Sequence, residues 1–129
     1  MKSFLDSHDL NERLIDFAVR IIFITDGLSN TRAGNHLAGQ LVRSGTSPAL
    51  NYGEAQSGES RKDFIHKLQI VLKELRETMN ALKIIRKAKM FRDSNYLEET
   101  IQENNELISI LVKSVATAKK NDEDESKKK

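Results

Sequence analysis

The sequence contains no cysteine, no tryptophan and a single proline among its 129 residues. The absence of cysteine excludes disulfide bonds and metal sites built from thiolates. Aromatic residues are also few, with five phenylalanines and two tyrosines. This scarcity of proline and aromatic residues, with abundant leucine, isoleucine, glutamate, lysine and arginine, favours helices over sheets. A chain of this length forms one domain and rarely two.

Long apolar runs are missing as well. The longest apolar stretch covers residues 17–24 and is broken by Arg20, so it is far shorter than the roughly 20 residues that a membrane-spanning helix needs. An acidic residue, Asp6, arrives before any long apolar segment, and the amino terminus lacks the pattern of a signal peptide. We therefore expect a cytoplasmic protein that has no membrane partner.

The charges are distributed unevenly along the chain, although the net charge is only +2. Residues 60–92 carry ten basic and three acidic side chains. The following segment, residues 93–118, carries one basic and five acidic side chains. A strongly basic segment is thus followed directly by an acidic one, and this contrast is more informative than the net charge.

Apolar residues recur at alternating spacings of three and four, which is typical of helices that pack in bundles. The inward positions are Leu10, Leu14, Phe17, Ile21, Ile24 and Leu28 in the first segment; Leu37, Leu41, Ser44, Ser47 or Pro48, Asn51 and Ala55 in the second; Phe64, Leu68, Val71, Leu75, Thr78, Leu82 and Ile85 in the third; and Leu97, Ile101, Asn104, Ile108, Leu111, Val115 and Ala118 in the fourth. Ser60 and Ser94 are expected to cap the third and fourth helices. The third helix should end near Lys89.

Four amphipathic helices joined by short connections predict an all-α, up-and-down antiparallel four-helix bundle over residues 1–119. Residues 120–129 contain almost nothing that can be buried, so they are predicted to form a disordered charged tail. The second helix contains Pro48, whose missing amide hydrogen predicts a kink near this residue, with two shorter helices as the alternative.

The inward face of the second helix is unusually small and polar in its middle. The structural interpretation is close helix packing, with Asn51 hydrogen-bonded inside the bundle and Arg43 paired with Glu74 or Glu77 of the third helix. The alternative is a ligand or partner site. We favour the structural interpretation for the polar cluster of Arg43, Ser44, Ser47, Asn51, Glu54, Glu74 and Glu77.

Signals of catalysis are weak. No histidine follows a glutamate at the Glu-x-x-His spacing of di-iron bundles, and no Gly-x-Ser-x-Gly elbow or phosphate-binding loop is present. Glu74 and Glu77 lie three residues apart, but no histidine joins them by spacing. We expect no cofactor, no metal and no enzymatic activity, and a metal-dependent bundle enzyme is the least favoured hypothesis.

The basic third segment is the best functional signal, because contacts with phosphates dominate affinity for nucleic acids. The candidate contacts are Lys67, Lys73, Arg76, Lys83, Arg86, Lys87 and Lys89, and Arg61, Lys62 and Arg92 add to the same charge. The alternative is that these charges solvate the outer face and pair with acidic residues of the first and fourth helices. Few aromatic residues lie on this helix, so we expect recognition of backbone or shape.

The first helix carries more apolar residues than one bundle face needs. Beyond its inward positions it contains Ile15, Val19, Ile22 and Phe23. Exposed patches of this kind mark protein contacts. We therefore predict a homo-oligomer held partly by these four residues.

Three segments resemble a known family. Residues 40–55 (QLVRSGTSPALNYGEA), 63–68 (DFIHKL) and 72–78 (LKELRET) look like the signature of the four-helix bundle proteins encoded in intervening sequences of bacterial 23S ribosomal RNA genes. The resemblance implies a ring-shaped oligomer, expected to be a pentamer, without enzymatic activity. It also points to a relative, the accessory variability determinant of diversity-generating retroelements, a basic barrel that binds nucleic acid and a reverse transcriptase.

Matched by position, the polar residues that resemble the family's are the seven of the polar cluster named above. The combined prediction is a non-enzymatic homo-oligomeric bundle that binds structured RNA or DNA through the basic third helix. The alternative prediction is a scaffold that binds a protein partner and has no role with nucleic acid.

Overall fold

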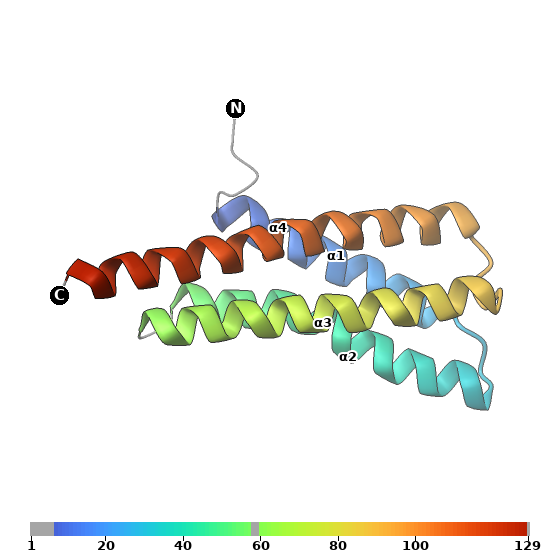
Figure 1. The fold of residues 1–129 in the computed structure, drawn as a ribbon. Helices are drawn as coiled ribbons and strands as arrows, with labels where there is room; N and C mark the ends of the chain where they lie inside the picture. Colours follow the sequence, from blue (N-terminus) through green and yellow to red (C-terminus); the bar gives the residue numbers. More distant parts are fainter. Residues whose placement is uncertain (1–6, 58–59, 129) are drawn as a thin grey trace.

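The computed structural model describes residues 7–57 and 60–128 of the chain. In these residues the helices are α1 (Ser7–Asp26), α2 (Arg32–Gln56), α3 (Arg61–Lys87) and α4 (Ser94–Lys128). Each helix packs against the next, and α4 closes the bundle against α1. Figure 1 shows helices that are consecutive in sequence running in opposite directions. The predicted all-α antiparallel four-helix bundle is confirmed.

The core consists mainly of the inward positions that the sequence predicts. Phe17 of α1, Leu75 of α3 and Leu111 of α4 are completely buried. At two positions a neighbouring residue is buried instead: Tyr52 of α2 in place of Asn51, and Leu107 of α4 in place of Ile108. The predicted positions resume at Leu111, so the shift in α4 is confined to one turn.

Short polar side chains begin three of the helices. The hydroxyl of Thr31 accepts a hydrogen bond from the amide of Gly34 at 3.0 Å, and that of Ser60 accepts from Asp63 at 3.1 Å. The predicted cap at Ser94 is wrong, because Asp93 Oδ1 accepts the hydrogen bond from the amide of Tyr96 at 3.0 Å. A carboxylate here also matches the positive end of the helix dipole.

The second helix is continuous through Pro48 and bends about half-way along its length, where its colour passes from cyan to green in Figure 1. Pro48 cannot donate to the carbonyl of Ser44, which weakens the helix at this point. Gly45 lies beside the bend, and a Cβ atom there would come within 2.5 Å of Ile21 Cγ2. The small residues of α2 therefore allow α1 and α2 to approach closely, as the structural interpretation of this face predicts.

The carboxyl-terminal prediction needs correction. The structure continues α4 to Lys128, through most of the segment 120–129 for which a disordered tail is predicted. No proline or glycine follows Ser94, so nothing in the sequence terminates the helix. An ion pair between Arg61 Nη2 and Glu125 Oε2, at 2.9 Å, ties the end of α4 to the start of α3.

The end of α3 is fixed by its backbone. Lys89 adopts a left-handed conformation with φ of 57°. Its amide donates to the carbonyl of Arg86 at 3.2 Å, and the amide of Met90 donates to Ile85 at 3.0 Å. These two hydrogen bonds form a Schellman motif, in which the left-handed residue is usually glycine.

Candidate nucleic-acid interface

The outer face of α3 carries a row of lysine and arginine side chains. Lys73, Arg76, Lys83 and Lys87 follow one another at spacings of three, seven and four residues, so they share one face of the helix. All four are exposed. None of them forms an ion pair with a side chain in residues 7–57 or 60–128. We call these four residues the basic row.

Two other predicted contacts are engaged in ion pairs. Lys67 pairs with Glu54 of α2. Arg86 Nη1 contacts both carboxylate oxygens of Glu98 on α4, at 3.0 and 3.2 Å. Pairing with the acidic fourth helix, which the sequence offers as an alternative, therefore applies to part of the basic segment only.

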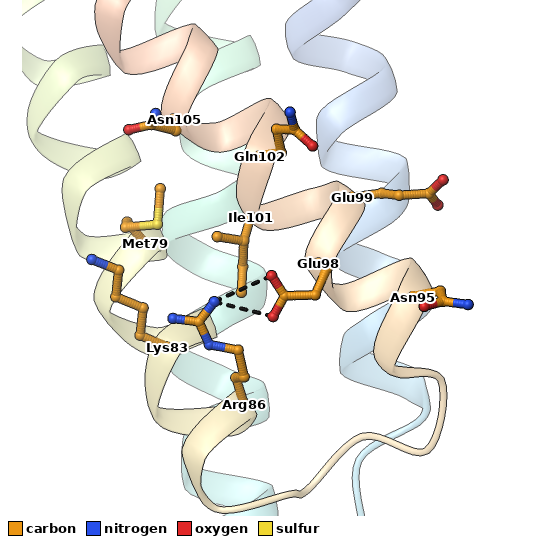
Figure 2. Close-up of a pocket in the computed structure, with 9 residues that line it drawn as sticks. All are labelled: Met79, Lys83, Arg86, Asn95, Glu98, Glu99, Ile101, Gln102 and Asn105. Carbon is orange, nitrogen blue, oxygen red and sulfur yellow. Dashed lines mark hydrogen bonds and ion pairs between the residues drawn. The ribbon is translucent and has the colours of Figure 1, made fainter.

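A shallow groove of about 620 Å³ runs between α3 and α4 beside the basic row. Figure 2 shows Lys83 at its edge and the Arg86–Glu98 ion pair across it, whereas Glu99 points away toward α1. Glu99 instead contacts Arg20 of α1 at 3.4 Å. The groove thus has a cationic edge on α3, and its acidic residues on α4 are turned toward arginines.

The polar cluster separates into two groups in the structure. Arg43 joins α2 to α3, with its Nη1 2.9 Å from Glu74 Oε2 and its Nη2 2.7 Å from Glu77 Oε2. These contacts raise the pKa of Arg43 above its ordinary value, the hydrogen bond that it donates to Glu77 having the largest effect and the charge of Glu74 the next. Beneath them, the hydroxyl of Thr78 donates to Ser44 Oγ at 2.9 Å.

The second group stays within or near α2. Asn51 is half-buried and donates to the carbonyl and the hydroxyl of Ser47, at 3.0 and 2.8 Å. Asn51, which the sequence predicts to be hydrogen-bonded inside the bundle, thus has its partner one turn earlier on its own helix. Glu54 is exposed and contacts Lys67, as described above.

The four apolar residues predicted to extend the face of α1 are all exposed. Ile15, Val19 and Ile22 recur at spacings of four and three and lie along the outer side of α1. Phe23 follows Val19 by four residues and in addition packs against Tyr96 of α4, with the ring centroids 4.7 Å apart. We call the first three residues the α1 apolar stripe.

Ion pairs that the sequence analysis missed attach α1 to α4. Arg13 donates to Glu103 through Nη2 at 2.6 Å and Nε at 3.1 Å, and this hydrogen bonding raises the pKa of Arg13 despite partial burial. Arg20 donates from Nε to Thr100 Oγ1 at 2.9 Å. Both helices are rich in acidic residues, and periodicity did not indicate that the two arginines of α1 meet acceptors on α4.

The sequence profile of the 23S rRNA-intervening sequence protein family matches residues 7–113, which include all of α1, α2 and α3 and the first half of α4. This chain belongs to the 23S rRNA-intervening sequence protein family. The segment with Arg43, Ser44 and Pro48 and the segment with Glu74 and Glu77, on which the resemblance rested, meet in this structure at the α2–α3 interface.

A crystal structure of a protein of unknown function from the S23 ribosomal protein family of Bacteroides thetaiotaomicron is similar to this family member. The two sequences are 31% identical, the match covers 85% of this chain and 97% of the other, and the TM-score is 0.77. No curated protein matches the chain in sequence. The relationship therefore supports the bundle fold and family, while function has to be argued from this chain's own residues.

The described part of this family member shows neither a cluster of metal ligands nor a membrane-spanning helix. No group of three or more histidine, aspartate or glutamate side chains lies close enough to hold a metal ion there. Across residues 7–57 and 60–128, no helix has a segment both apolar and long enough to span a bilayer.

Proposed function

We propose that this member of the 23S rRNA-intervening sequence protein family is a non-enzymatic, homo-oligomeric bundle that binds nucleic acid through the basic row of α3. The observation that supports this proposal is the exposure of Lys73, Arg76, Lys83 and Lys87 on one helix face without ion-pair partners in the described residues. Other cations, such as Lys67 and Arg86, have carboxylate partners. An anionic ligand would supply the missing partners.

The dimensions of the basic row suit a phosphate backbone. Lys73 and Lys87 are separated by about 21 Å along the helix axis, given a rise of about 1.5 Å per residue. Lysine and arginine contacts with phosphates release condensed counterions, and this release makes the affinity dependent on salt. With four contacts in each chain, we expect the slope of log K against log salt to be about −3.6 on duplex DNA.

Oligomerisation would increase the affinity of the protein for nucleic acid further. The α1 apolar stripe provides a surface for a second copy of the chain, since Ile15, Val19 and Ile22 are 40%, 59% and 44% exposed. Several basic rows in one assembly can contact one ligand at the same time, which increases the overall affinity without new contacts. A ring, expected from the family resemblance to be a pentamer, fits this arrangement.

The test is titration of purified protein with structured RNA and with duplex DNA at low and at moderate salt. We expect binding that weakens steeply with salt, and weakens by about tenfold or more in the double variant Lys73→Glu/Lys83→Glu. The matched control is Lys113→Glu, which replaces an exposed lysine of α4 that is not a member of the basic row. No binding at low salt, or equal loss in the control, would contradict the proposal.

A second candidate is a protein-interaction scaffold without a role in nucleic-acid binding. The α1 apolar stripe favours it, because this surface can equally contact a different protein. A pull-down whose partner survives nuclease treatment and is lost in Val19→Lys would support the scaffold. Dependence of the captured partner on intact nucleic acid would support the first candidate.

A further inference from the structure

An aromatic cluster lies at the end of the bundle where α1 ends and α4 begins. Phe23 of α1 packs with Tyr96 of α4 at 4.7 Å between ring centroids, with the planes tilted by 53°. It meets Phe91, from the connection between α3 and α4, at 6.1 Å in a T-shaped arrangement. The sequence shows these three residues far apart, and the fold brings them together.

The neighbours of the cluster hold it in place and leave one ring accessible. The guanidinium of Arg20 lies 4.0 Å from the ring centroid of Tyr96, and its Nη2 donates to the carbonyl oxygen of the same residue at 3.2 Å. Phe91 is only 7% exposed. Phe23, in contrast, is 50% exposed although it rests on both other rings. The cluster therefore presents Phe23 to solvent on a fixed support.

Cations lie next to Phe91 in the sequence. Lys89 and Arg92 lie within two residues of Phe91, both are exposed, and neither forms an ion pair in the part of the chain that the structure describes. The acidic residues nearby in sequence are Asp26, Asp93, Glu98 and Glu99. Asp93 caps α4, whereas Glu98 and Glu99 form ion pairs with Arg86 and Arg20. Lys87, the last member of the basic row, ends α3 just before this connection.

The backbone conformation of Lys89 is unusual for a lysine. Its φ of 57° is a conformation that disfavours side chains and favours glycine. A lysine at this position is therefore strained without forming any ion pair within the described residues. Strain of this kind is a reason to look for a function of the side chain.

We propose that this end of the bundle binds single-stranded nucleic acid, with one base stacked on Phe23 and the flanking phosphates contacting Lys89 and Arg92. The inference rests on the proposed function and specifies the form of its ligand. Stacking of bases on aromatic side chains beside a basic surface is the recurring way in which proteins bind single strands, and it tolerates any base. Uridine and thymidine oligomers share this chemistry, so both are ligands to test.

A fluorescent variant tests the stacking directly, because the protein contains no tryptophan. In Phe23→Trp we expect tryptophan fluorescence to be quenched by oligouridine or oligothymidine of roughly 12 nucleotides, a length within the usual range of single-strand sites. An abasic phosphodiester of the same length should bind without quenching. The control is Leu50→Trp, at a position on α2 that is 68% exposed.

Three outcomes would overturn the inference by fluorescence alone. The first is binding of the base-containing oligomers without quenching of the tryptophan at position 23. The second is a tryptophan that is already shielded from acrylamide in the free protein, since another copy or protein would then cover this surface. The third is equal quenching in the Leu50→Trp control.

Two further variants separate this inference from the proposed function. Phe23→Leu should reduce affinity for single strands by about tenfold while leaving affinity for duplex DNA nearly unchanged. Lys89→Gly should reduce single-strand affinity by about threefold without loss of thermal stability, because it removes a phosphate contact and also backbone strain. If Phe23→Leu binds normally while Lys73→Glu/Lys83→Glu does not, the aromatic site is wrong and the basic row stands. If the wild-type protein binds no nucleic acid, both proposals fail.

Discussion

The side chain of Asn104 on α4 donates a hydrogen bond from Nδ2 to the carbonyl oxygen of Leu75 on α3, at 3.1 Å, in the amide orientation that satisfies its surroundings. In the same orientation, its Oδ1 accepts from the amide of Met79 at 3.1 Å. The amide is completely buried. It therefore fixes the position of α4 along α3, a role that buried asparagines play in helical assemblies.

Replacing Asn104 with aspartate should destabilise the bundle strongly. The carboxylate would be buried against the carbonyl of Leu75 without a compensating cation, and we expect the free energy of unfolding to fall by about 3 kcal/mol. Chemical denaturation measures this change. The adjacent Asn105→Asp is the control, because Asn105 is exposed and should tolerate the charge. Equal effects in both variants would contradict the role assigned to Asn104.

Replacing Gly45 with alanine should also destabilise the fold. The added Cβ would lie 2.5 and 2.7 Å from two side-chain carbons of Ile21, and overpacking of this kind costs about 1–3 kcal/mol. Gly39→Ala in the same helix is the control, because nothing lies within 4 Å of its Cβ position. There the better helix propensity of alanine should stabilise the protein by about 0.5–1 kcal/mol. Opposite shifts in melting temperature are therefore expected.

The Arg43→Met variant should reveal the burial of Glu74. The side chain of Glu74 is 9% exposed, and in this variant it would lose the guanidinium that now contacts it at 2.9 Å. A buried carboxylate without a partner is unfavourable, so we expect a loss of about 2 kcal/mol in the free energy of unfolding. Glu77→Gln, which alters the more exposed partner of Arg43, should cost about 1 kcal/mol or less. A larger loss in Glu77→Gln would show that Glu77 is the more important partner.

Variants of Lys89, the left-handed residue at the end of α3, can separate the effects of backbone strain and of charge on stability. Lys89→Gly should raise the free energy of unfolding by about 1 kcal/mol, since glycine adopts the observed φ without steric cost. Lys89→Ala removes the same charge but keeps the strained backbone, so its stability should match that of the wild type. Thermal denaturation of the three proteins under one condition makes the comparison. A stabilisation of equal size in Lys89→Ala would mean that charge, not backbone conformation, is responsible.

A lysine in the α1 apolar stripe should dissociate the oligomer without unfolding the chain. Val19 is 59% exposed in the single bundle, so Val19→Lys leaves the core intact but places a charge in the expected contact. Sedimentation or light scattering should show a smaller species with an unchanged helical circular dichroism spectrum. Leu50→Lys, on α2, should keep the original size. If it is Leu50→Lys that dissociates the assembly, the contact lies on α2 instead.

The regular parts of the fold could be predicted from the sequence because they depend on repeated local patterns. The inward residues of α1 and α3, such as Phe17 and Leu75, follow directly from apolar spacing. The pairing of Arg43 with Glu74 and Glu77 also followed, since opposite charges on adjacent helices have few other partners.

The other features depend on the length of each helix and on its rotation about its own axis, which the spacing of apolar residues alone does not determine. The sequence predicts a buried hydrogen bond for Asn51 and places Asn104 only among the inward positions of its helix, whereas the packed bundle shows that Asn104 is the one that bonds between helices. The tail was predicted from its inability to be buried, but a charged helix needs no burial when nothing terminates it. The approach of Phe23 to Tyr96 left no local signal, because it joins two helices about 70 residues apart.

The anchoring of α3 has a consequence for recognition. Ser60 caps the start of this helix, and Asn104 of α4 forms hydrogen bonds with its backbone near the middle. The turn at Lys89 ends it. The backbone positions of its basic side chains are consequently fixed, and their spacing along the helix does not change when a partner approaches. A binding partner whose anionic groups match that spacing loses little entropy on the protein's side, so selectivity can arise from geometry before any base is read.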